Sequence, residues 1–119
     1  MIDETAGRRM VEDMAGRFPE LRAAFDRHVE DVGELLPHVL LWDVVELTVK
    51  AYEGESDLDW RSLLLFLETR LADRDQYVSE LIGTSFLESL PGPRMPGHGI
   101  VFELGPLAAS MFRELRPAG

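Results

Sequence analysis

The 119-residue chain contains no cysteine. This absence excludes disulfide frameworks, thiolate zinc sites and cysteine nucleophiles, and it indicates a reducing compartment. Lysine is nearly absent too, because Lys50 is the one lysine among 12 basic residues. We interpret the resulting arginine excess as a mark of a GC-rich bacterial genome. Long apolar runs are also missing: none approaches the roughly 18 residues that a membrane helix needs, and the N-terminus lacks the apolar core of a signal peptide. We therefore expect a cytoplasmic protein with no membrane partner.

The spacing of apolar residues predicts an all-α protein. Sustained alternation of apolar and polar residues, which is typical of strands, is not found, whereas apolar positions recur at helical spacing. A chain of this length buries a core without disulfides or metals. We expect a single helical domain, residues 1–119, built as a compact bundle of about six helices. The first lies within residues 1–16 with Asp3 as its N-cap, and the others span about 19–32, 37–53, 57–72, 76–90 and 106–116.

The stretch DVGELLPHVLLWD, residues 31–43, is interpreted as a joint between two helices. In a continuous helix, Asp31, Glu34 and His38 would share one face and could form a metal or acid–base cluster. Pro37 argues against continuity because its ring clashes with the preceding turn and it cannot donate a backbone hydrogen bond, at a cost of about 3 kcal/mol. A helix that ends at Gly33 and another that starts with Pro37 use both residues where they are favoured.

Several local patterns lead to further expectations. Ser56 and Asp59 are spaced as a capping box, and Asp57 and Arg61 as an ion pair, for a helix that starts near Asp57. Gly83 lies in the middle of a predicted helix, where it would allow another helix to approach closely. The segment PGPRMPGHGIVF, residues 91–102, predicts a rigid loop with its last residues tucked under the domain. Trp42 and Trp60 are expected in the core.

The chain offers no recognisable catalytic motif, and an enzyme is the less favoured interpretation. The acids from Glu53 to Asp59 do not form a calcium loop, because no glycine lies at the sixth position of a loop from Asp57 to Glu68. Trp60 and residues 63–67 also belong to a predicted helix. Ser85 in IGTSFLE lacks the second glycine and the preceding strand of a nucleophile elbow. We therefore predict no catalytic residue, no cofactor and no metal.

Negative charge is concentrated in one part of the chain. The formal net charge is −10, and residues 26–59 hold ten acids against Arg27 and Lys50. Such a surface repels nucleic acid and anionic membranes and attracts basic proteins, although an ordinary solubilising surface would look the same. The candidate partner-binding residues are Glu30, Asp31, Glu34, Asp43, Glu46, Glu53, Glu55 and Asp57.

Two alternatives remain open. The first is a small-molecule or metal-dependent site near the joint, made by Glu34 and His38 with Arg94 and His98. The second is a homodimeric scaffold, joined through the apolar excess of the third and fourth helices. His28 shares an apolar helix stripe, which favours a hydrogen-bonded histidine at the edge of the core over a ligand. His38 lies one turn before Trp42 and is expected to stack on it.

Four fragments resemble a family of small bacterial all-helical domains of unknown function. They are FPEL at 18–21, GELLPHVLLWD at 33–43, LIGTSFLESL at 81–90 and LGPL at 104–107, so the likeness covers a core of about residues 17–116. Such domains are similar to small acidic proteins found near polymorphic toxin genes. The resemblance implies a non-enzymatic immunity or inhibitor role against a basic toxin, and it carries no catalytic residue across.

Overall fold

The computed structural model describes residues 4–119. Its elements in chain order are α1 (Thr5–Arg17), α2 (Pro19–Val32), α3 (Pro37–Tyr52), α4 (Trp60–Ala72), α5 (Gln76–Leu81), η1 (Ile82–Phe86), η2 (Leu87–Ser89), η3 (His98–Glu103) and α6 (Pro106–Leu115). The described residues form no strand. The expected all-α fold of about six helices is therefore confirmed. Asp3, the expected N-cap of the first helix, lies outside the described residues, and α1 runs to Arg17 rather than stopping at Gly16.

Prolines and a glycine set the boundaries around the joint as expected. α2, α3 and α6 each begin with proline in the first turn, where its missing N–H costs nothing. α2 ends at Gly33, whose φ of 89° lies in the left-handed region that glycine adopts without strain. The chain then restarts as a helix at Pro37. Asp31, Glu34 and His38 therefore do not share one continuous helical face.

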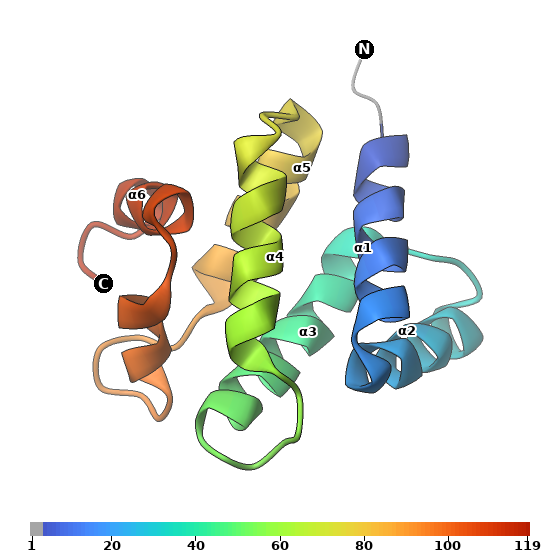
Figure 1. Ribbon diagram of the computed structural model, residues 1–119, viewed down its shortest axis with the longest axis horizontal. Helices are drawn as coiled ribbons and strands as arrows, with labels where there is room; N and C mark the ends of the chain where they lie inside the picture. The colour runs from blue at the N-terminus through green and yellow to red at the C-terminus, as the bar shows by residue number, and fades with distance from the viewer. Residues whose placement is uncertain (1–3) are drawn as a thin grey trace.

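α3 runs through the middle of the protein, between α1 and α2 on one side and α4 and η1 on the other (Figure 1). Its inward positions are buried, including Leu40, Leu41, Val44 and Thr48, and the Thr48 hydroxyl is satisfied by donating to the Val44 carbonyl at 2.6 Å. α6 lies on the far side of α4 from α1 and α2 (Figure 1). This arrangement leaves one long strip of α3 open to solvent.

The start of α4 differs from the prediction. Asp59 is the N-cap of a helix that begins at Trp60, and its carboxylate accepts from the Ser62 N–H at 3.1 Å. Ser56 caps no helix, because its hydroxyl accepts from the Leu58 N–H inside the preceding turn. Arg61 does not pair with Asp57; it lies over the Trp60 ring and 3.9 Å from Glu103. The predicted capping box of Ser56 and Asp59 and the predicted ion pair of Asp57 and Arg61 are therefore wrong.

The predicted helix over 76–90 is helical to Ser89 but changes its winding. α5 widens into the π-turn η1 at Ile82 and tightens into the 3₁₀ turn η2 at Leu87. A Cβ on Gly83 would lie 3.1 Å from the Met111 sulfur of α6, which confirms the expected close approach of another helix.

The segment 91–102 is not a loop throughout, because its end forms the 3₁₀ helix η3. Ile100 is buried as expected, whereas Phe102 is 79 % exposed, so only part of the run is tucked under the domain. Among residues 4–119 no helix combines the length and the apolar character needed to cross a bilayer.

Candidate interaction surface

The exposed strip of α3 is flanked by two hollows. The first, which we call the Trp42 hollow, has a volume of about 550 Å³ and lies between α3 and the segment 89–96. Its apolar lining includes Trp42, Val45, Val49, Pro91, Met95 and Pro96. Trp42 is 53 % exposed and Met95 is 61 % exposed. Two large apolar side chains thus stand open to solvent on either side of one shallow depression.

Acidic side chains border the Trp42 hollow. Glu46, Glu53 and Glu55 line it, against one base, Lys50. The Lys50 ammonium lies 3.1 Å from the Glu46 carboxylate, four residues earlier on α3, and both side chains are largely exposed. That exposed pair neutralises the only cation of the hollow without contributing much stability. The hollow therefore presents an apolar floor with a net negative rim.

The wall formed by segment 91–97 is packed closely against α3. Gly97 has a φ of 85°, and a Cβ there would overlap the Val49 side chain at 2.5 Å. Behind it, the imidazole of His98 hydrogen-bonds to the Pro91 carbonyl at 2.9 Å, and its ring packs edge-on against Phe102. Glycine at position 97 is thus required both by backbone conformation and by space, and it fixes this wall of the Trp42 hollow.

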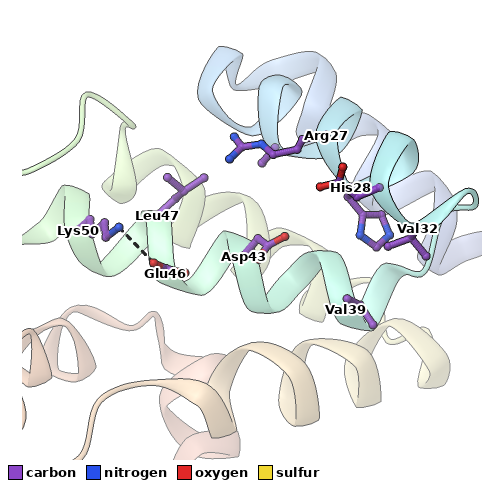
Figure 2. Close-up of a pocket in the computed structure, with 10 residues that line it drawn as sticks. Arg27, His28, Val32, Val39, Asp43, Glu46, Leu47 and Lys50 are labelled. Carbon is purple, nitrogen blue, oxygen red and sulfur yellow. Dashed lines mark ion pairs between the residues drawn. The ribbon is translucent and has the colours of Figure 1, made fainter.

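The second hollow, which we call the His28 pocket, has a volume of about 390 Å³ and separates α2 from α3 (Figure 2). Its apolar lining is Ala24, Val32, Val39 and Leu47, and its polar lining is Arg27, His28, Asp31, Asp43, Glu46 and Lys50. Glu46 and Lys50 also line the Trp42 hollow. The two hollows therefore meet along the exposed strip of α3.

All eight acids expected to bind a partner are exposed, but they do not form a single cluster. Five line the two hollows, namely Asp31, Asp43, Glu46, Glu53 and Glu55. Asp57 lines a different hollow, next to Arg17 and Glu20. Glu30 and Glu34 line none of these depressions. The acidic surface is thus centred on α3 rather than on the joint.

The four residues of the alternative ligand site are not brought together. His38 lies in the first turn of α3 and packs edge-on against Trp42, with ring centroids 6.0 Å apart, as expected. His98 follows Gly97, which contacts Val49 near the other end of the helix. Positions 38 and 49 are eleven residues apart on one helix, which corresponds to about 16 Å along its axis. Within residues 4–119, no hydrogen bond or ion pair joins any two of the residues Glu34, His38, Arg94 and His98, and no group of acids and histidines has metal-binding geometry.

The expectation that both tryptophans belong to the core is wrong for Trp42. Trp60 is partly buried and packs edge-on against Tyr52 at 5.1 Å, whereas Trp42 faces solvent. Sequence reasoning also did not identify Met95 as an exposed apolar side chain. A signal was present, because Met95 lies between Pro93 and Pro96, and a rigid loop limits how far that side chain can turn inward. His28 is a hydrogen-bonded histidine at the edge of the core, as expected.

Asp59 has a lowered pKa, because hydrogen bonds from the Ser62 hydroxyl and the Ser62 backbone N–H hold it below its ordinary value of 3.8. Asp59 caps α4 and lines neither of the two hollows. The α3 surface thus combines exposed apolar side chains with exposed acids.

The family model described as Domain of unknown function (DUF7674) matches residues 11–99. The chain belongs to this family. Both the Trp42 hollow and the His28 pocket lie entirely within the part that matches the DUF7674 model, whereas α6 lies outside it. No curated protein and no solved structure matches the chain.

Proposed function

We propose that this DUF7674 domain is a non-enzymatic protein-binding domain, and that the α3 surface holds a basic partner protein. The observation that carries the proposal is Trp42, an aromatic side chain 53 % exposed in an apolar hollow with an acidic rim. Tryptophan is one of the residue types enriched among the few side chains that supply most of the binding energy at protein interfaces.

The charge of the surface supports a basic partner. Glu46, Glu53 and Glu55 surround the hollow, and Lys50 is already paired with Glu46. Complementary charge accelerates association and excludes acidic competitors, while the apolar anchors supply affinity. The specific form of the proposal is an immunity or inhibitor protein that covers a basic toxin or effector, in a bacterial cytoplasm where both are made.

The first test identifies the partner and then measures its affinity. The tagged protein is expressed in its native host, and a stoichiometric basic protein is expected to remain bound at low salt and to leave at high salt. Calorimetry with the purified partner is then expected to show that Trp42→Ala weakens binding at least about tenfold.

The matched control is Phe102→Ala, which removes another exposed aromatic outside both hollows. It is expected to leave affinity unchanged. The role of charge is tested with two charge reversals. Glu46→Lys changes an acid that lines the hollow, Glu114→Lys makes the same change on α6, and only Glu46→Lys should weaken binding. Equal affinities for Trp42→Ala and wild type, or equal effects of the two charge reversals, would contradict the proposal.

A homodimeric scaffold remains the second candidate, and one observation favours it. Leu65 is 63 % exposed on α4, one of the two helices expected to supply a dimer interface. Sedimentation equilibrium distinguishes this candidate, since a monomer at high protein concentration excludes it. If the protein does dimerise, Leu65→Asp should return it to monomer.

A further inference from the structure

His28 carries a hydrogen-bond donor that the protein itself leaves unused. The residue is 5 % exposed, and its Nε2 accepts from the Leu36 N–H at 3.0 Å. Nε2 therefore bears no proton, and the neutral ring carries its proton on Nδ1. Within residues 4–119, no hydrogen bond from Nδ1 to a protein atom is found, and no fully enclosed side-chain nitrogen or oxygen lacks a partner. Nδ1–H is therefore open to solvent, on a ring that lines the His28 pocket.

A free carboxylate faces this donor. Figure 2 shows Asp43 on α3 pointing across the pocket toward the His28 ring on α2. Neither Asp43 nor Asp31, which lines the same pocket, forms an ion pair among the described residues. Arg27 is directed away from His28, toward the end of the pocket where Leu47 and Lys50 lie (Figure 2). The His28 end thus combines one N–H donor with acidic acceptors and no nearby free cation.

We propose that the His28 pocket binds a primary amine with an uncharged hydrogen-bond acceptor on the adjacent carbon, such as an α-amino amide. The ammonium pairs with Asp43 and Asp31, and the neighbouring carbonyl oxygen accepts from His28 Nδ1–H. A carboxylate in place of the amide is disfavoured because it would face two carboxylates. Val32, Val39 and Leu47 give the pocket apolar walls, which suit an aliphatic side chain on the ligand.

This chemistry occurs both in small amines and at the N-terminus of a peptide, and the pocket opens at the protein surface. The site does not depend on the proposed partner at the Trp42 hollow, because its donor and acceptors come from His28, Asp31 and Asp43. A result that disproves ligand binding in the His28 pocket would therefore leave the proposed function untouched, and a result that disproves the proposed function would leave the His28 pocket untouched.

The test is a titration of the ¹⁵N-labelled full chain with leucinamide, followed by nuclear magnetic resonance. Saturable shifts are expected for residues lining the pocket and for the His28 ring nitrogens. N-acetyl-leucinamide, which lacks the positive charge, should produce no such shifts, and leucine should bind more weakly than leucinamide. Leucyl-glycyl-glycinamide distinguishes the sources: binding equal to leucinamide assigns the pocket to a peptide N-terminus, and loss of binding assigns it to a small amine.

Substitutions complete the test. Asp43→Asn is expected to weaken leucinamide binding about tenfold, while Asp57→Asn, the same change outside the pocket, should leave it unaltered. Asp43 is exposed, so the variant should fold. The proposal is overturned if leucinamide and N-acetyl-leucinamide give equal shifts, if Asp43→Asn binds as wild type does, or if the ring spectrum of the free protein places the proton on Nε2.

Discussion

Neighbouring residues on α3 have opposite environments. Leu41 is fully buried and Trp42 is 53 % exposed, although the chain is apolar at both positions. α3 is apolar nearly all round, so its periodicity does not show which side the other helices cover. The exposure of Trp42 depends on where the other elements pack around α3: Leu41 lies in the core, whereas Trp42 lines an open hollow. That is a tertiary property, and for this reason sequence reasoning assigned Trp42 to the core.

Truncating these two neighbours should separate binding from stability. Trp42→Ala is expected to lower the free energy of unfolding by clearly less than Leu41→Ala does, because Trp42 is 53 % exposed and its truncation leaves no cavity in the core. Leu41→Ala should cost about 2–5 kcal/mol, since it leaves a cavity in the core. Urea denaturation of both variants measures the difference. A large loss of stability in Trp42→Ala would show that the side chain supports the fold rather than a binding surface.

Asp59 is expected to contribute a pH-dependent part of the stability. Its pKa in the folded protein is lowered by the hydrogen bonds from Ser62. A lowered folded pKa stabilises the protein at pH above the unfolded pKa, and this stabilisation is lost as the pH falls through the folded pKa. The stability advantage of wild type over Asp59→Ala should therefore be constant at neutral pH and shrink below pH 3.8.

Thermal denaturation across this pH range checks the sign. Asp59→Asn is the informative companion, because asparagine caps a helix without titrating. An advantage of wild type over Asp59→Asn that grows as the pH falls would contradict the assignment.

At the scale of elements, α6 depends on a residue far away in sequence. The Glu68 carboxylate of α4 accepts from the backbone N–H groups of Leu107 and Ala108, at 2.6 and 2.9 Å. It thus caps the first turn of α6 and complements the positive end of that helix. The first-turn proline was visible in the sequence, but a cap 39 residues away was not, because no local pattern connects the two.

Removing this cap should destabilise the protein measurably. Glu68→Ala is expected to lower the free energy of unfolding by about 1–2 kcal/mol, because two N–H groups lose their acceptor. Glu114→Ala, an exposed acid on α6 itself, is the control and should be nearly neutral. Equal effects of the two changes in urea denaturation would rule out the capping role of Glu68.

Local signals predicted most of the helix boundaries. Gly33 and Pro37 defined the joint, because a left-handed C-cap and a first-turn proline are properties of single residues. The transition from α5 to the π-turn η1 was not predictable in this way. Gly83 lies in this π-turn and packs against Met111 of α6, so the change in winding occurs at a contact between two elements. The start of α4 was missed for a related reason, since Ser56 and Asp59 both have capping side chains and only the fold decides between them.

At the scale of the whole molecule, the acidic charge is unevenly distributed along the chain, and the exposed acids that line the two hollows lie between Asp31 and Glu55, on α3 and the segments next to it. The positions of these acids in the sequence could be read directly, whereas their division between two hollows and a separate site at Asp57 required the fold. If this field steers a basic partner, the association rate constant should fall at least about tenfold between low and high salt. Stopped-flow fluorescence of Trp42 would report the rate, and a dissociation rate that changes little with salt is expected alongside it.

Hydrogen–deuterium exchange of the complex with the purified partner tests the central claim most directly. The partner is predicted to slow exchange in residues 42–55 and 89–97, which line the Trp42 hollow, while α6 and the start of α1 exchange as in the free protein. Protection confined to α4 and α6, with the Trp42 hollow unchanged, would contradict the account.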